Sequence, residues 1–146
     1  MKRKLVVCLV VLFTVILGSG TFAQSIGKLL TKSEADILFG KPVFSFTLEK
    51  KVFDKIFTDT STVFLFNVNK NKLAIFDRKK NLVYPDTVQM STNEIYFIYS
   101  RDKLQELLDA SKVSNSLSIE MRESTLTITS GQSTLEYAWP CPPMCP

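Results

Sequence analysis

The spacing of hydrophobic and polar residues divides the chain into one long apolar run and a series of shorter elements. Residues 5–17 are apolar except for Thr14. The later apolar segments are all much shorter than the roughly 20 residues that a membrane-spanning helix needs. Their periods, near 3.6 or near 2, are those of the helices and strands of a globular domain.

Two segments have the period of an amphipathic helix. Thr31 and Glu34 form a capping box at the start of the first helix, and Gly40 ends it. Its expected buried stripe consists of Ala35, Leu38 and Phe39. The second helix begins at Ser100 or Asp102, and its expected buried residues are Leu104, Leu107 and Leu108. Residues 50–57 also have apolar side chains at helical spacing.

The remaining segments predict strands. Residues 44–48 alternate between apolar and polar, whereas residues 63–68 and 95–99 are apolar on almost every position. Further strands are expected within residues 73–76, 82–84, 117–121, 126–128 and 135–139. A strand that is apolar on almost every position needs other elements packed on both of its faces, whereas an alternating strand needs them on one face only. We therefore expect an α+β domain, with a mainly antiparallel sheet of six to eight strands and two or three short helices packed on it.

The alternation in the last strands also predicts which side chains form the core. Leu126, Ile128, Leu135 and Tyr137 share one face and are expected to be buried. Thr127 lies on the opposite face, where we expect a surface position.

The beginning of the chain has the features of a secretory signal peptide. A cationic start at residues 2–4 precedes the apolar run, and the small residues Thr21 and Ala23 satisfy the cleavage rule. The alternative is an uncleaved anchor helix, for which the apolar run is short. We expect residues 1–23 to be removed, residues 24–139 to form one α+β domain, and residues 140–146 to form a tail rich in Pro and Cys.

Removal of this leader changes the charge of the protein. The whole chain has a formal net charge of +4, and three of its cations lie in the leader, so the mature chain has +1. Such a balance does not indicate nucleic-acid binding. Two consecutive turns nevertheless concentrate five cations in a candidate basic patch, namely Lys70, Lys72, Arg78, Lys79 and Lys80. The alternative is that these are ordinary solvated turns that protect strand ends.

The residue types present exclude several kinds of catalysis. The chain has no histidine, which removes Ser-His and Cys-His catalysis and every imidazole metal site. The spacing Ser-x-x-Lys occurs at Ser25 and Lys28 and again at Ser100 and Lys103. The companion motifs of the enzymes that use such a pair are absent. A helix cap explains the second copy more simply. We expect a protein that is not an enzyme and has no catalytic residue.

The tail contains both cysteines of the mature chain, Cys141 and Cys145. In an oxidising compartment two cysteines usually form a disulfide. Along an extended polyproline path their Cα atoms lie about 12 Å apart, and a disulfide tolerates no more than about 7 Å. A disulfide therefore requires a turn at Pro142 and Pro143.

The sequence Cys-Pro-Pro-Met-Cys-Pro of the tail resembles the C-P-x-x-C-P loop of the thioredoxin-fold copper chaperones that serve cytochrome oxidase. That family places the loop early in its fold and adds a distant histidine ligand, which this chain lacks. What the resemblance implies is limited to a set of soft ligands suited to Cu(I), Cys141, Met144 and Cys145.

Together these features predict a small exported domain, periplasmic or extracellular, without a transmembrane segment in the mature chain and without a cofactor. We expect it to bind a ligand or a partner, such as a protein or another envelope component, through its sheet or loops. The alternative is a thiol-redox or Cu(I)-binding protein that acts through the tail.

Overall fold

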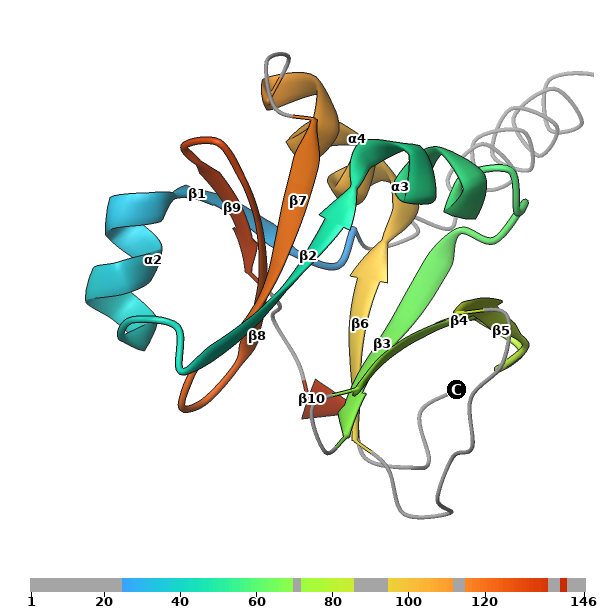
Figure 1. The fold of residues 1–146 in the computed structure, drawn as a ribbon, viewed down its shortest axis with the longest axis horizontal. Coiled ribbons are helices and arrows are strands. Elements are labelled where there is room, and N and C mark those ends of the chain that lie inside the picture. The colour runs from blue at the N-terminus through green and yellow to red at the C-terminus, as the bar shows by residue number, and fades with distance from the viewer. Residues whose placement is uncertain (1–24, 70–71, 86–94, 112–114, 137–139, 142–146) are drawn as a thin grey trace, which may run out of the picture.

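The computed structural model describes residues 25–69, 72–85, 95–111, 115–136 and 140–141. Within these ranges three helices and two antiparallel sheets form an α+β fold, which confirms the predicted class (Figure 1). The strands are divided between two sheets that share one core. Period-two alternation shows which side chains share a face but does not specify which strands pair. The sequence pattern therefore could not separate two sheets from one.

Each sheet contains five strands. Sheet 1 has the order β1-β9-β8-β7-β2, and its strands are β1 (Lys28–Thr31), β2 (Phe44–Glu49), β7 (Ser116–Met121), β8 (Leu126–Ser130) and β9 (Ser133–Glu136). Sheet 2 has the order β10-β6-β3-β4-β5, and its strands are β3 (Val63–Asn69), β4 (Lys72–Asp77), β5 (Leu82–Tyr84), β6 (Tyr96–Ser100) and β10 (Pro140–Cys141).

Two of the helices connect the sheets at one end of the molecule. α3 (Lys50–Ile56) leads from β2 to β3, and α4 (Arg101–Ala110) leads from β6 to β7 (Figure 1). The segment that contains α4 therefore connects the two sheets. Both helices contribute buried residues to the shared core, which are Phe53, Ile56, Leu104, Leu107 and Leu108.

The third helix, α2 (Lys32–Phe39), lies against sheet 1. Its predicted capping box is confirmed, since the Thr31 N–H donates to the Glu34 carboxylate at 2.8 Å and the Glu34 N–H donates to the Thr31 hydroxyl at 3.2 Å. The expected apolar stripe is only partly correct. Ala35 is buried, but Leu38 is 60% exposed and Phe39 is half-buried. The reason is that the face of sheet 1 beneath α2 is polar.

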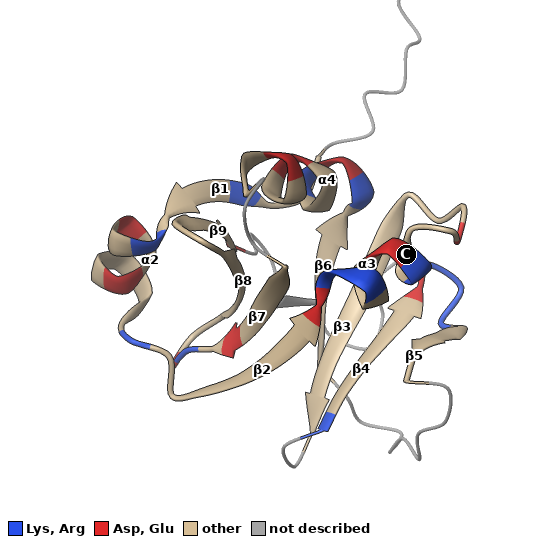
Figure 2. Cartoon of the chain, turned by 45° about the horizontal axis from the view of Figure 1, so that its top comes forward, with Lys and Arg blue, Asp and Glu red and all other residues tan. Residues whose placement is uncertain are grey.

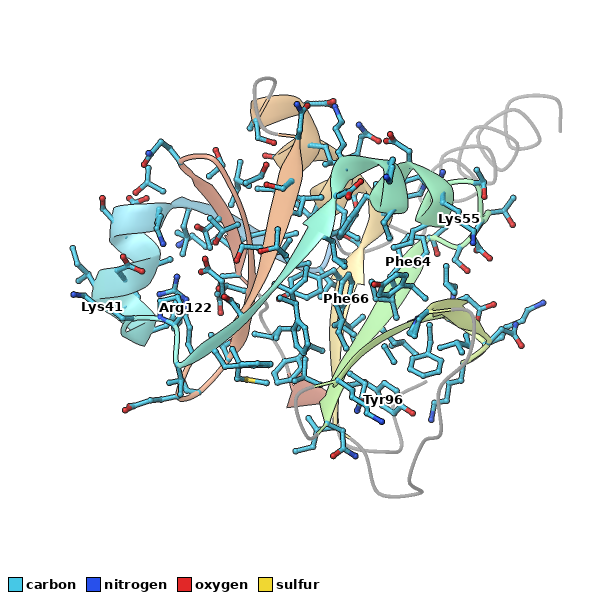
Figure 3. The ribbon with its side chains drawn as sticks, viewed as in Figure 1. Lys41, Lys55, Phe64, Phe66, Tyr96 and Arg122 are labelled. Carbon is cyan, nitrogen blue, oxygen red and sulfur yellow. The ribbon has the colours of Figure 1, made fainter. Side chains whose placement is uncertain are left out.

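The shared core fills the space between the sheets. Phe64 and Phe66 of β3 are fully buried, and Figure 3 shows them projecting from that strand. Tyr99 packs edge-on against Phe66 at 5.2 Å between ring centroids, and its hydroxyl donates to the Leu126 carbonyl of the other sheet. The predicted core residues Leu126, Ile128 and Leu135 are all buried, and Tyr137 lies outside the described residues.

The opposite face of sheet 1 is also buried, which contradicts the predicted surface position of Thr127. This side chain is fully buried beneath α2, where its hydroxyl accepts a hydrogen bond from Arg122 Nε at 3.0 Å. Thr129 and Thr134 face the same layer and lie 3.0 Å apart between their hydroxyl oxygens. Sheet 1 therefore separates an apolar core from a buried polar layer.

Candidate binding cleft

The structure describes only one of the three tail residues proposed as disulfide or metal ligands. Cys141 ends β10, and its backbone pairs with Tyr96 of β6. Met144 and Cys145 lie outside the described residues. In the described part of the chain no group of three or more His, Cys, Asp or Glu side chains could hold a metal ion. The disulfide and the Cu(I) site both remain predictions.

The cations of the candidate basic patch are separated by a strand. Lys72 begins β4, whereas residues 78–80 form the turn that follows its last residue. Figure 2 shows Lys and Arg residues at both ends of β4. Lys80 Nζ lies 5.3 Å from the ring centroid of Tyr96, and Lys70 lies outside the described residues. The two turns therefore do not bring Lys72 together with the other three described cations.

The two Ser-x-x-Lys segments lie side by side, and both serines and Lys103 are engaged in structural contacts. The Ser100 hydroxyl accepts from the Ile26 N–H at 3.1 Å, and Lys103 binds Glu106 at 2.6 Å. Ser25 donates to Asp102. Burial opposes ionisation of Asp102, but hydrogen bonds from Ser100, Ser25 and the backbone outweigh it and lower its pKa. These contacts attach the first described residues to the start of α4.

A cleft that was not predicted from the sequence lies at the end of the core opposite α3 and α4. It has a volume of about 420 Å³, within the range of small-ligand sites. Three segments line it: the end of β3, the start of β6, and the turn between β7 and β8. Its lining residues are Asn67, Val68, Asn69, Ile95, Phe97, Met121, Arg122, Glu123, Ser124 and Thr125.

The floor of the cleft is apolar. Val68, Phe97 and Met121 are half-buried and pack against the shared core, so the cleft extends the core to the surface. Ile95 is 60% exposed at the rim. Asn67 is almost completely buried, and its Nδ2 donates to the Ile95 carbonyl at 3.0 Å. This bond holds the residue before β6 against β3.

The polar wall is the turn between β7 and β8. The Arg122 N–H donates to the Thr125 carbonyl at 2.9 Å and closes the turn. Glu123 and Ser124 at its tip are exposed. An apolar floor beside such a rim can bind a molecule with an apolar body and hydrogen-bonding groups at one end.

Arg122 is the one cation among the described lining residues, and its guanidinium is already engaged by the protein. It binds Glu120 at 2.7 Å, Asp36 at 2.7 Å and the Thr127 hydroxyl at 3.0 Å, and it also donates to the Gly40 carbonyl. Figure 3 places Arg122 between sheet 1 and α2. With its guanidinium committed and the Glu123 carboxylate at the rim, the cleft favours a neutral or cationic ligand over an anion.

The sequence contained one indication of this site. Asn67 interrupts an otherwise apolar run, and in the structure it stabilises the cleft wall. Comparison of the chain with protein-family models, curated proteins and solved structures finds no match. The candidate site therefore rests on its geometry.

Proposed function

We propose that this protein is an exported, non-enzymatic domain that binds a neutral or cationic ligand with an apolar body in the cleft between its sheets. The observation that supports this function best is the cleft at the end of the core that no described helix covers. Helices α3 and α4 cover the other end, whereas Val68, Phe97 and Met121 form an apolar floor bordered by a polar turn. Burial of such a floor by a ligand is favourable by about 25 cal/mol per Å² of apolar surface.

The non-enzymatic part of the proposal is supported by the contacts of the remaining nucleophile candidates. Ser100 exchanges hydrogen bonds with the backbone of Ile26, and Lys103 is paired with Glu106. Neither a hydroxyl nor an amine in this arrangement is activated for attack on a substrate.

Export is supported by the leader pattern of residues 1–23. Cleavage after Ala23 leaves the contacts of Ser25 and Ile26 with the start of α4 intact. The finer expectation of a periplasmic or extracellular location follows from the same leader. Intact mass of protein from the exporting host should give a chain that begins at Gln24, and retention of Cys8 contradicts this.

Binding can be tested with Nile red, a neutral apolar dye, and the mature chain. We expect dye fluorescence to rise on binding to one site. Ile95→Asp places a carboxylate on the apolar rim and should weaken binding about tenfold, which corresponds to roughly 1.4 kcal/mol. Ser124→Trp should weaken binding by filling the cleft from its exposed turn.

Ile37→Asp provides the matched control, because Ile37 is an exposed isoleucine, at 82%, outside the cleft. This variant should bind the dye as the parent does. If Ile37→Asp weakens binding and Ile95→Asp does not, the cleft is not the binding site.

A further inference from the structure

The outer edge of β2 has no neighbouring strand among the residues that the structure describes. β2 is the last strand in the order of that sheet and pairs with β7 alone among the described strands. Figure 2 shows β2 at the margin of sheet 1, beside β7. The side chains of Ser45, Thr47 and Glu49 are all exposed. This edge is therefore accessible to another strand.

The hydrogen-bond pattern identifies the backbone groups at this edge. The Lys50 N–H donates to Asn115 at 2.9 Å, one position beyond the register pair of Glu49 and Ser116. In an antiparallel ladder, residues that bond to the neighbour alternate with residues that point away from it. The N–H and C=O groups of Ser45, Thr47 and Glu49 consequently point toward the open edge.

The shared core is incompletely covered beside the same edge. Phe44 and Phe46 lie on the core face of β2, in an edge-on contact of 4.6 Å between centroids, and both are only half-buried. Leu48, further along the strand, is buried. Three of the four large hydrophobic residues exposed in the described chain also lie just before β2 or within α2, namely Ile37, Leu38 and Val43. Of these, Val43 directly precedes β2 and adds apolar surface next to Phe44.

The middle of β2 lacks the charges that usually protect a sheet edge. The run from Phe44 to Leu48 contains only aromatic, aliphatic and hydroxyl side chains. Its charges lie at the far end, where Glu49 is paired with Lys51 at 2.5 Å. An uncharged exposed edge of this kind favours pairing with a further strand.

We propose that a second copy of this chain occupies the edge, with β2 pairing antiparallel to β2 of the partner about a two-fold axis at Thr47. This register uses all three outward-facing residues: Thr47 meets its own copy, and Ser45 meets Glu49 in both directions. It also places Phe46 opposite Leu48 on the core face, so that each copy covers the half-buried ring of the other.

Two-fold registers centred on either of the other two outward-facing residues are less favourable. Pairing centred on Glu49 places two carboxylates opposite each other, which is destabilising. Pairing centred on Ser45 leaves Glu49 beyond the end of the paired region of β2. Among these three registers, the one centred on Thr47 alone avoids a pair of carboxylates and keeps Glu49 within the paired region. This inference does not depend on the ligand proposed for the cleft.

Cysteine crosslinking tests the axis directly. In the mature chain with Cys141→Ser and Cys145→Ser, Thr47→Cys should form an interchain disulfide under mild oxidation. Ser45→Cys alone should not, because in this register its two copies are four residues apart, about 13 Å, beyond the ~7 Å limit of a disulfide. Mixing Ser45→Cys with Glu49→Cys should restore the crosslink.

Light scattering after size-exclusion chromatography should give the mass of two chains for the mature protein. It should give the mass of one chain for Thr47→Pro. Thr47 points its N–H away from β7, so proline there removes an intermolecular donor and leaves the bonds within sheet 1. A crosslink with Ser45→Cys alone contradicts the proposed register. A single-chain mass for the parent, together with no crosslink from Thr47→Cys, overturns the proposal.

Discussion

Thr127 and Ile128 are neighbours in β8 whose side chains enter two different buried layers. Ile128 lies in the core between the sheets, and Thr127 lies beneath α2. The alternation of the sequence separated these two faces correctly. It could not show that both are covered, because the group that binds Thr127 is Arg122, whose own partner Asp36 lies 86 residues away.

Substitutions at these two positions should both destabilise the fold. Ile128→Ala should lower the free energy of unfolding by about 2–5 kcal/mol through the cavity it leaves. Thr127→Ala should lower it by about 1–3 kcal/mol, because Arg122 Nε loses its acceptor in a buried site. Urea unfolding measures both. Thr127→Ser retains the hydroxyl and serves as the control, and equal stability of the Ala and Ser variants contradicts the role of this hydrogen bond.

Two carboxylates should affect the pH dependence of stability in opposite directions. The hydrogen bond from Arg122 lowers the pKa of Asp36 below its ordinary value of 3.8, so its stabilising contribution is present above that pH and is lost as the pH falls below it. Burial raises the pKa of Glu136 above 4.5, and this outweighs the attraction of Lys28, so its ionisation destabilises the fold as the pH rises through the raised value.

Melting temperatures at pH 7 and pH 3 test these signs. Asp36→Asn should be less stable than the parent at pH 7, and the difference should narrow in acid. Glu136→Gln should be more stable than the parent at pH 7, and this gain should disappear at pH 3. A gain from Asp36→Asn at pH 7 is incompatible with the ion pair of Asp36 and Arg122.

At the scale of elements, local signals predicted where helices begin and which leucines they bury. The capping box of α2 and the buried face of α4 required only neighbouring residues, and both are confirmed. The side by which α2 docks depends on a distant strand. Lys32 and Asp36 of α2 bind Glu120 and Arg122 of the β7 region, so the helix turns polar positions inward and leaves Leu38 exposed.

The ends of α3 and α4 are joined by Arg101. Its guanidinium donates to the carbonyls of Phe57, at 2.5 Å, and Asp59, and it lies 5.3 Å from the Phe57 ring centroid. Arg101→Lys retains the positive charge but loses the planar guanidinium, whose two nitrogens donate to two carbonyls at once. It should lower the free energy of unfolding by about 1–2 kcal/mol. Arg78→Lys, in an exposed turn, should change it by less than ~0.5 kcal/mol. Equal effects in a denaturant titration contradict the joining role.

At the scale of the whole molecule, the tail begins beside the cleft. Pro140 of β10 pairs with Phe97, which also lines the cleft. In the oxidising compartment proposed for this protein, Cys141 and Cys145 should form a disulfide. Thiol titration of denatured protein purified without reductant should then detect no free cysteine. Two free thiols per chain would remove the disulfide and favour the Cu(I) alternative, which competition with a colorimetric Cu(I) chelator and Cys141→Ser can test.

The cleft exists only in the assembled molecule, which is why no single segment predicted it. Its walls come from three separate parts of the chain, represented by Asn67, Ile95 and Ser124, and their approach depends on how the two sheets pack. The positions of α3 and α4 also follow from the packing of the two sheets, because these helices lie in the connections between them. Two connections between the sheets cover one end of the core, and among the described residues no helix covers the opposite end.

The most direct measurement is methyl NMR of the mature chain during titration with Nile red. Binding in the cleft should shift the methyl signals of Val68, Ile95 and Met121, which line it. The signals of Ile37 on α2 and Leu65 on the other face of sheet 2 should remain unchanged. Shifts at Ile37 or Leu65 without shifts at the cleft residues would contradict the proposal that the cleft is the binding site.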